Sequence, residues 1–505
     1  MTELPRGWVW TNVSSVANLV RGVSYRKEES SKEPKGGYIP ILRANNIDGE
    51  LNFSKLVYVP RKRVSDEQII KAFDILIAMS SGSKELVGKA SQANRNFDGG
   101  FGAFCGLVRV TQEIDRKYAG FFFQSPNYRS AISRLSSGVN INNLRRDHIE
   151  SMPIPLPPLS EQHSIVAKIE ELFTKLDAGV EALNKIKAQL KRYRQAVLKH
   201  AFEGKLTEEW RQAHKHELEP ASSLLERIKQ KRLKTAKGKY KDLSPLDITG
   251  LPELPKDWVW VTLKEIGAND KNAIVDGPFG SNLKVSDYIE DDTGVPVLTT
   301  KNLEYGYNKK QLRYISHEKF EQLRRSEVRS GDILVAKIGS CGKTGVYPDN
   351  MPSAMIPANL LKMTVNSWIE RMYVYYFLNS PILKGELEEI TTATAQPAFN
   401  VSKFRSLGFP LCPYAEQHRI AEEIERRFSI ADEIEKTVDH SLQQAERLRQ
   451  SILNKAFEGK LVPQDPNDEP AEKLLERIKG QKVKQMAEKR VTVSKVKRRE
   501  GTEGS

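Results

Sequence analysis

The chain has 505 residues, which is enough for two to four domains that each bury a core of their own. No apolar run approaches the roughly 20 residues of a membrane helix, the N-terminus lacks a signal-peptide pattern, and Cys105, Cys341 and Cys412 form no disulfide or metal-ligand framework. These features predict a cytoplasmic protein without a membrane partner, and the net charge of +14 favours a polyanionic partner.

The chain begins with a globular domain, residues 1–158, in which short β-rich runs are broken by Gly, Asn and Pro. Polar loops follow the runs Ile39–Leu42 and Asp74–Ala78, and their side chains can hydrogen-bond base edges or phosphates. Each loop taken alone also fits an ordinary protein surface. The Gly-rich stretch Phe97–Gly102 predicts a plain turn. The candidate nucleic-acid contacts in this domain are Arg43, Asn45, Asn46, Ser81, Ser83 and Lys84.

A long helix, residues 159–206, follows a proline-rich extended exit from this globular domain. Apolar residues recur along it at three- and four-residue steps, with Tyr193 among them, which predicts an apolar seam on a charged helix. Ser160 resembles an N-cap, and Gly204 falls where the helix would stop. A basic linker with a short helix, residues 207–252, comes next.

The second half of the chain repeats this order. It has a globular domain at residues 253–413, a helix at 414–461, and a short helix with a basic tail at 462–505. The sequence AFEGKL ends both helices, and 19 of 47 aligned positions in the two helical segments are identical. This pattern indicates a duplication rather than a solenoid, because the repeat is about half the chain.

Loops of the second globular domain match those of the first. Lys301 and Asn302 follow the run Val295–Leu298, and Asn302 coincides with Asn46. A second loop follows the run Asp332–Ala336, where small and basic residues would allow close approach to a phosphate backbone. The candidate contacts in these two loops are Lys301, Asn302, Lys337, Lys343 and Thr344.

Neither long helix can bury its apolar seam alone. We therefore expect the two copies to pack as an antiparallel coiled coil, and the second seam includes Ile434 and Leu448. The alternative is that each helix packs back on its own globular domain. The residues expected at helix contacts or at a partner-protein contact are Glu161, Gln162, Ile165, Ile169, Phe173, Phe202, Glu416, Gln417, Ile420, Ile424, Phe428 and Phe457.

The sequence offers no catalytic motif. Gly339–Thr344 lacks the first glycine of a phosphate-binding loop, since that position is Lys337. No histidine pair at helical spacing suggests a zinc site, and no methyl-donor or nuclease motif is present. We therefore expect neither a catalytic residue nor a metal ligand on this chain.

The chain resembles the specificity subunits of type I restriction-modification systems. The residues that carry the resemblance are Leu4–Trp10 and Leu254–Trp260 at the start of each half, Asp276–Lys284, Gly331–Val335, Pro153–Gln162 and the two AFEGKL helix ends. It covers residues from about Leu4 to Lys479. The first half has no clean copy of Asp276–Lys284. Through this motif the resemblance adds Gly277, Phe279, Ser281, Asn282 and Lys284 to the candidate DNA contacts.

The resemblance implies a non-catalytic DNA-reading subunit. Each globular domain would be a target-recognition domain for one half of a split, asymmetric site on double-stranded DNA, and the helices would set the separation. Two methylation subunits would bring S-adenosylmethionine, and two restriction subunits would use ATP and Mg²⁺, so this chain would hold no cofactor itself. A coiled-coil scaffold that does not read sequence is the competing hypothesis, and a fused methyltransferase or nuclease is a third.

The fold class that follows is α+β. We expect two mixed α and β target-recognition domains, joined and spaced by two long antiparallel helices in a pseudo-twofold internal repeat.

Overall fold

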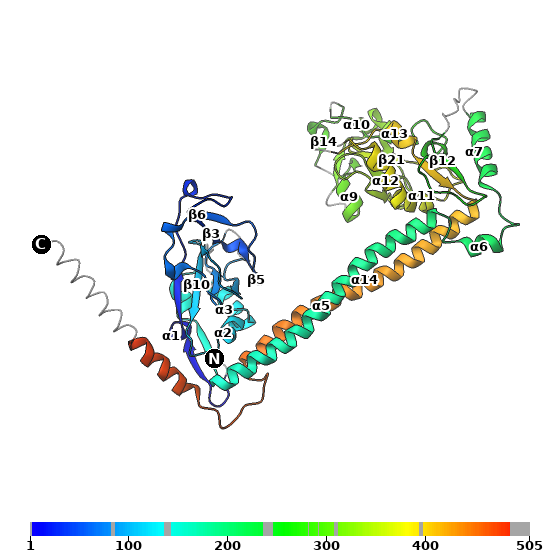
Figure 1. The fold of residues 1–505 in the computed structure, drawn as a ribbon. Coiled ribbons are helices and arrows are strands. Elements are labelled where there is room, and N and C mark those ends of the chain that lie inside the picture. The colour runs from blue at the N-terminus through cyan, green and yellow to red at the C-terminus, as the bar shows by residue number, and fades with distance from the viewer. Residues whose placement is uncertain are drawn as a thin grey trace. The chain divides into compact units, whose positions relative to one another are not determined.

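The structure is a computed structural model in which residues 3–81, 86–135, 143–235, 246–280, 282–290, 292–307, 312–392 and 397–484 are described. Contacts divide the chain into two compact units. Unit 1 comprises Met1–Leu183 and Asp439–Ser505, and unit 2 comprises Asn184–Val438. Each of the two long helices contributes residues to both units (Figure 1). The predicted fold class is confirmed.

The first globular domain, which belongs to unit 1, consists mainly of short strands. The strands are β1 (Val9–Asn12), β2 (Ala17–Arg21), β3 (Tyr38–Leu42), β4 (Ile47–Asp48), β5 (Glu50–Leu51), β6 (Val57–Pro60), β7 (Ile75–Ala78), β8 (Ala90–Gln92), β9 (Gly100–Phe101), β10 (Cys105–Val110) and β11 (Pro153–Leu156). The helices are α1 (Val13–Val16), α2 (Arg116–Phe122), α3 (Pro126–Leu135) and α4 (Arg146–Glu150).

The main sheet of the first globular domain is antiparallel, in the order β2-β10-β7-β8. Strand β7 is buried on both faces, since Ile75 and Ile77 enter one core cluster while Leu76 and Ala78 enter another. This explains its unbroken apolar run. A second sheet, β6-β3-β9, includes the parallel pair β3 and β9. The prediction of a plain turn at Phe97–Gly102 is therefore wrong, because Gly100 and Phe101 pair with β3.

The second globular domain, in unit 2, has the same architecture. Its strands are β12 (Val259–Thr262), β13 (Ile274–Asp276), β14 (Tyr288–Ile289), β15 (Val295–Val297), β16 (Arg313–Ile315), β17 (Glu327–Val328), β18 (Ile333–Ala336), β19 (Thr344–Val346), β20 (Ala354–Met355), β21 (Leu360–Met363) and β22 (Gly408–Leu411). Its helices are α8 (Leu263–Ile266), α9 (Thr300–Tyr305), α10 (His317–Gln322), α11 (Arg371–Leu378), α12 (Pro381–Ile390) and α13 (Val401–Arg405).

The main sheet and one strand pair of the second globular domain match those of the first, whereas the second sheet has five strands instead of three. The sheet β13-β21-β18-β19 corresponds to β2-β10-β7-β8, and β12 pairs with β22 as β1 pairs with β11. The second sheet, β14-β16-β15-β20-β17, again contains one parallel pair, β15 with β20. The duplication seen in the sequence is thus a duplication of topology.

The two long helices are α5 (Leu159–Phe202) and α14 (Tyr414–Phe457). At 44 residues each, they are about 66 Å long. In unit 1 the guanidinium of Arg449 pairs with Asp177, and in unit 2 Arg194 lies 2.5 Å from Asp432. Early α5 residues therefore meet late α14 residues, and the helices are antiparallel as predicted.

Two details of the helix predictions are wrong. Helix α5 begins at Leu159, so Ser160 lies inside the first turn instead of capping it. Tyr193, Ile434 and Leu448 were expected in the apolar seam but are 41%, 42% and 51% exposed. Contact with a single partner helix buries only a narrow stripe of a helix, and these positions lie outside it.

The segment predicted as a linker packs into unit 2. It forms α6 (Glu208–Ala213) and α7 (Ala221–Thr235), and Ala221, Leu224 and Ile228 join the core of the second globular domain. The helix at residues 471–484 is its counterpart and joins the core of the first globular domain through Ala471, Leu474 and Ile478. No helix in the described ranges has the length and apolar character needed to span a membrane.

Candidate nucleic-acid interface

Each globular domain is tied to the start of a long helix by the same buried hydrogen bond. The indole N–H of Trp8 donates to Oε2 of Glu161 at 2.8 Å, and that of Trp258 donates to Oε2 of Glu416 at 2.9 Å. All four side chains are at most 5% exposed. These residues therefore orient the globular domain on its helix.

The next residue of each helix, a glutamine, adds a second link. Gln162 donates to the Pro157 carbonyl and accepts from the backbone N–H of Asp115, both at 2.9 Å. Gln417 makes the equivalent bonds to Cys412 and Glu370, also at 2.9 Å. The Glu-Gln pair that both halves share thus holds together the strand before the helix and the loop beside it.

The two buried glutamates differ in charge environment. Glu416 accepts from Arg211 at 2.7 Å and from Thr207 at 2.8 Å in addition to Trp258. Among the described residues, Glu161 has no ion-pair partner, and its Oε1 has no hydrogen bond. Burial raises the pKa of Glu161, although hydrogen bonds with Trp8 and Gln464 oppose this shift.

Each globular domain also receives the end of a long helix. In unit 1 the Phe457 ring lies 5.2 Å from Tyr118 and 5.6 Å from Phe122 between ring centroids. In unit 2 the Phe202 ring lies 5.2 Å from both Tyr373 and Phe377. The end of α14 thus completes the core of the first globular domain, and the end of α5 completes that of the second.

The glycines of AFEGKL allow this contact. Gly204 and Gly459 have φ values of +71° and +67°, which favour glycine. A Cβ at either position would lie 2.3 Å from a ring carbon of Pro255 or Pro5.

The residues predicted for helix or partner contacts lie mostly inside these junctions. Glu161, Gln162, Ile165, Ile169, Phe173, Phe202, Glu416, Gln417, Ile420, Ile424 and Phe457 are buried, and Phe428 is half-buried. A contact of this surface with another protein would therefore use the exposed residues around them.

The predicted loops of the first globular domain meet at one pocket of about 640 Å³. Arg43 and Asn45, from the loop after β3, line it together with Ser81, from the loop after β7. The Nε of Arg43 is buried without a hydrogen-bond partner, although its Nη2 donates to the Lys55 carbonyl at 3.3 Å. The structure thus brings together three residues that the sequence marked separately. Ser83 and Lys84 lie outside the described residues.

Sequence reasoning did not mark the other side of this pocket. Tyr25, Lys27 and Phe104 line it, from the loop after β2 and the turn before β10. Burial raises the pKa of Tyr25, and the Arg43 charge opposes this shift. The signal in the sequence that could have found Tyr25 and Phe104 is that each lies a few residues after a glycine, Gly22 or Gly102.

Asn46 and Asn302 shape their own loops. Oδ1 of Asn46 accepts from the Arg43 backbone N–H at 2.9 Å, and Oδ1 of Asn302 accepts from the Thr299 N–H at 2.7 Å. Both side chains are 1% exposed. A base contact would require these bonds to break, so their prediction as DNA contacts gains no support from the geometry.

The structure identifies the counterpart of the Asp276–Lys284 motif in the first half. Asp276 pairs with Leu361 on β21, and Arg21 pairs with Gly106 at the same place on β10. The next residues are Gly277 and Gly22, where a Cβ would approach a backbone oxygen of the neighbouring strand connection to 2.1 Å and 2.0 Å. Glycine is required at both positions by close packing.

Lys337 holds the motif loop of the second globular domain in place. Its ammonium lies 2.6 Å from Asp276 and 5.0 Å from the centroid of the Phe279 ring. Arg325 approaches the other oxygen of Asp276 at 3.4 Å. Because Lys337 is buried and paired, its role in this geometry is to support the loop, while Phe279 is 60% exposed.

The remaining predicted contacts of the second globular domain vary in exposure. Asn282, Lys284 and Lys301 are exposed, Lys343 is half-buried, and Thr344 is buried with its hydroxyl donating to the Gly342 carbonyl at 3.1 Å. Ser281 lies outside the described residues.

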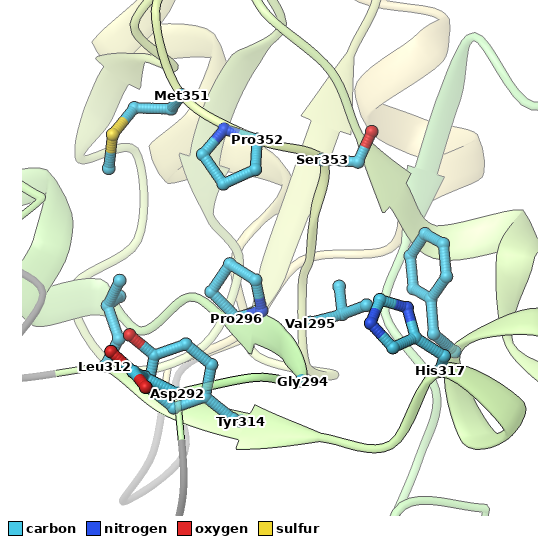
Figure 2. A pocket seen from close by; sticks show the side chains of 11 residues that line it. Asp292, Gly294, Val295, Pro296, Leu312, Tyr314, His317, Met351, Pro352 and Ser353 are labelled. Carbon is cyan, nitrogen blue, oxygen red and sulfur yellow. The ribbon is translucent and has the colours of Figure 1, made fainter.

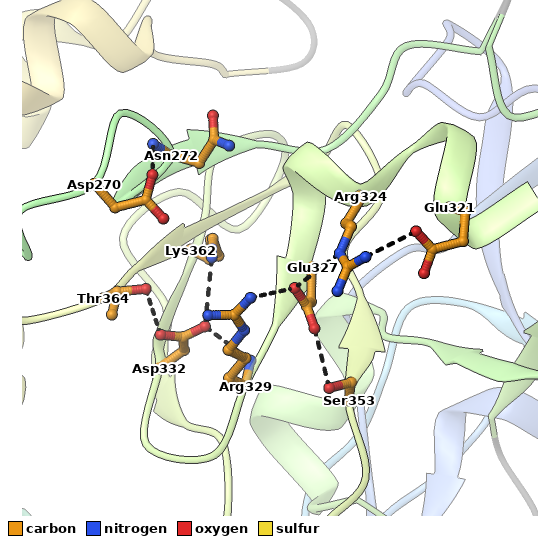
Figure 3. Close-up of polar contacts among 10 residues, drawn as sticks. All are labelled: Asp270, Asn272, Glu321, Arg324, Glu327, Arg329, Asp332, Ser353, Lys362 and Thr364. Carbon is orange, nitrogen blue, oxygen red and sulfur yellow. Dashed lines mark hydrogen bonds and ion pairs between the residues drawn. The ribbon is translucent and has the colours of Figure 1, made fainter. Parts of the chain in front are cut away.

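A buried ionic network supports the strand that leads into the Lys337 loop. Figure 3 shows Asp332 accepting from the Thr364 hydroxyl at 2.6 Å and from the Arg329 backbone N–H at 2.9 Å, with the Lys362 ammonium 3.6 Å away. In the first globular domain the equivalent Asp74 accepts from Lys71 N–H and pairs with Arg109 at 2.6 Å. Both halves thus fix the turn before this strand with an aspartate.

A smaller pocket of about 280 Å³ lies on the second sheet of the second globular domain. Figure 2 shows Pro296, Tyr314 and Pro352 at its apolar surface, with His317 and Asp292 at the sides. The His317 ring bonds to the Thr293 carbonyl at 3.2 Å. No group of three potential metal ligands occurs among the described residues.

Comparisons with known proteins agree with this architecture. A family model described as type I restriction modification DNA specificity domain matches residues 5–192 and 255–444. The chain is 32% identical to the type I restriction enzyme EcoKI specificity subunit of Escherichia coli (strain K12), covering 95% of this chain and 96% of that protein. It is 31% identical to the StySPI specificity subunit of Salmonella potsdam, with the same shares covered.

A solved structure shows the same fold. It is described as the structural basis underlying complex assembly and conformational transition of the type I R-M system. Its chain has a TM-score of 0.59 at 18% identity, covering 91% of this chain and 100% of that chain. The chain described here therefore belongs to the family of type I restriction-modification specificity subunits.

Proposed function

We propose that this chain reads an asymmetric, two-part sequence on double-stranded DNA. Each globular domain recognises one half-site, and the antiparallel helices set the unspecified spacer between them. The observation that supports this proposal most directly is a shared frame with different loops. The two globular domains have the same strand order in the main sheet and the same helix junctions, but they differ in the loops beside β2 and β13. Different loops on one frame favour two different half-sites.

Charge and exposure support DNA as the partner. The chain carries a net charge of +14, and Arg43, Lys27 and Lys284 lie at or near the loops that differ between the halves, while Lys301 is exposed in the segment after β15. Cations of this kind contact phosphates and fix the register of a protein on a duplex, whereas polar groups beside them read base edges.

Catalysis in the complex is proposed to reside on partner subunits. Two methylation subunits would bind S-adenosylmethionine, and two restriction subunits would bind ATP and Mg²⁺. The exposed residues around the shared helix junctions offer two equivalent docking surfaces, one in each unit. The complex would act in the cytoplasm, where the host chromosome is methylated.

The proposal can be tested by replacing the part of the first globular domain that lies between strands β1 and β11. Residues 13–152 would be replaced by those of another family member, which keeps Trp8, the β1–β11 pair and the Glu161 junction. Methylome sequencing of cells that express the graft should show one altered half-site, with the other half-site and the spacer unchanged. Alteration of both half-sites would contradict the division of reading between the globular domains.

The competing function is a scaffold that does not read sequence. The assembled complex should bind a duplex carrying the methylated motif more tightly than a scrambled duplex, at the same salt concentration. Equal binding of the two duplexes would favour the scaffold.

A further inference from the structure

The two most exposed aromatic side chains among the described residues are both phenylalanines, one in each globular domain. Phe104 is 69% exposed, and Phe279 is 60% exposed. Phe104 is in the turn between β9 and β10, whereas Phe279 follows β13 in the Gly-Pro-Phe-Gly segment. They do not align in the sequence, because they come from different loops.

The backbone nevertheless places the two rings at the same site of the shared fold. The Phe104 carbonyl accepts from the Met79 N–H at 2.8 Å, and the carbonyl of Asn359 accepts from the Lys337 N–H at 2.8 Å. Asn359 is therefore the structural counterpart of Phe104. By the strand register that equates Gly22 with Gly277, Ser24 is the counterpart of Phe279.

Ser24 and Phe104 line the same pocket, so the two loops meet in the first globular domain. In the second globular domain they meet at Lys337, whose backbone N–H bonds to Asn359 and whose ammonium lies 5.0 Å from the Phe279 ring. Each globular domain thus puts one ring at this meeting point. The first globular domain supplies the ring from the turn before β10, and the second supplies it from the loop after β13.

The surroundings of both rings are cationic. Lys27 and Arg43 line the pocket beside Phe104. Beside Phe279, Asp276 neutralises the buried Lys337, whereas the Arg325 side chain, 3.4 Å from the other oxygen of Asp276, is 59% exposed. An apolar ring held in water among cations is unfavourable for an isolated protein, but it matches a duplex, where phosphates meet the cations and bases meet the ring.

The start of the Phe279 loop is also held by close packing and an ion pair. Gly277 packs against the backbone of Ile356 and Pro357, and Asp276 is bound by Lys337 at 2.6 Å. A ring fixed in advance loses little conformational entropy when it meets its target.

We infer that Phe104 and Phe279 each pack against a base of their own half-site, as the apolar specificity contact of their globular domain. This inference rests on the proposed function. Because the rings come from different loops, each would favour a different base or step. A phenylalanine that is carried by one loop in the first domain and by the other loop in the second is one way in which a single frame would read two sequences.

The test uses the full chain assembled with its methylation subunits and a duplex that carries the methylated motif of the host genome. Phe104→Ala and Phe279→Ala should each weaken binding of this duplex about 10-fold, with binding of a scrambled duplex and the salt dependence unchanged. The double variant should lose about 100-fold, because the two contacts are independent. Each single variant should relax base preference in one half-site, and the two half-sites should differ.

Leu135→Ala and Leu233→Ala are matched controls, since these side chains are 37% and 49% exposed in unit 1 and unit 2. They should bind both duplexes as the unaltered complex does. The inference, but not the proposed function, would be overturned if both phenylalanine variants still bound the motif duplex in preference to the scrambled one. It would also be overturned if they lost affinity equally for the two duplexes. An unaltered complex that does not discriminate would overturn the proposed function as well.

A second measurement needs no variant. In a series of duplexes with 2-aminopurine at successive positions, the unaltered complex should change the fluorescence at one position in each half-site besides the adenine that the methylation subunits would flip out, because a ring there disturbs base stacking. The absence of such a position in either half-site would overturn the inference.

Discussion

The two equivalent glutamates of the helix junctions should respond in opposite ways to the same substitution. Glu161 and Glu416 both accept from a buried tryptophan, but only Glu416 also binds Arg211 and Thr207. We therefore expect Glu161→Gln to be tolerated and Glu416→Gln to destabilise unit 2.

The structure sets the size of each effect. In Glu416→Gln, one side of the carboxylate becomes an N–H donor, so that Arg211 or Trp258 loses its acceptor. The side chains of Arg211 and Glu416 are 11% and 0% exposed, and breaking such a buried pair costs about 3 kcal/mol. In Glu161→Gln the amide oxygen still accepts from Trp8, and the amide nitrogen replaces Oε1, which has no partner among the described residues. The expected change is within about 0.5 kcal/mol.

Glu161 should also make the stability of unit 1 depend on pH in a predictable direction. Burial raises its pKa in the folded state, so folding favours the protonated form. The stabilisation is fully present below the pKa of the unfolded chain and is lost as the pH rises through the higher folded-state pKa. Unit 1 should therefore become more stable on moderate acidification, and Glu161→Gln should remove this gain.

Hydrogen exchange of the full chain, followed by mass spectrometry, resolves the two units. Peptides that contain β7 report on unit 1, and peptides that contain β18 report on unit 2. For Glu416→Gln the β18 peptides should exchange about 150-fold faster, which corresponds to about 3 kcal/mol, while β7 is unchanged. Equal losses from the two substitutions, or a larger loss from Glu161→Gln, would refute the assignment of the charge partner.

Substitutions in the two cores and an insertion in the helices test the packing further. Phe457→Ala should destabilise unit 1 and Phe202→Ala should destabilise unit 2, each by about 3–5 kcal/mol, as domain-resolved hydrogen exchange would show, and loss in the opposite unit would contradict the packing. Burial raises the pKa of Glu386 to about 7, so unit 2 should lose thermal stability as the pH rises through about 7, and Glu386→Gln should flatten this profile; an unchanged profile would remove that glutamate as the cause. Insertion of four residues after Ala188, with a matching insertion after Val438, lengthens each helix by about 6 Å and should lengthen the methylated spacer with both half-sites intact; methylation at the old spacing would rule out a helical ruler.

The sequence predicted the frame well because the frame depends on local patterns. The apolar periodicity of α5 and α14, the proline-rich exits and the glycine helix ends are each readable over a few residues. The width of the buried stripe on each helix could not be predicted from the sequence. The exposure of Tyr193, Ile434 and Leu448 depends on how many neighbours surround the helix.

The candidate site was harder to predict for a physical reason. Asn46 and Asn302 were selected because both halves keep them, yet a polar residue that two diverged loops share is one the fold itself uses, here as a buried loop bridge. Phe104 was missed because its counterpart is Asn359, and the ring in the other half comes from a different loop. Only the strand register reveals that equivalence. Likeness between the halves therefore marks the frame, and the reading surface that we propose lies where the exposed residues of the two halves differ.

The central claim is that two diverged globular domains on one duplicated frame read two different half-sites. The methylated motif of the host genome, obtained by methylome sequencing with and without this chain, tests it most directly. We predict a motif that depends on this chain and consists of two unlike half-sites separated by an unspecified spacer of fixed length. A palindromic or uninterrupted motif, or an unchanged methylome without this chain, would contradict the claim.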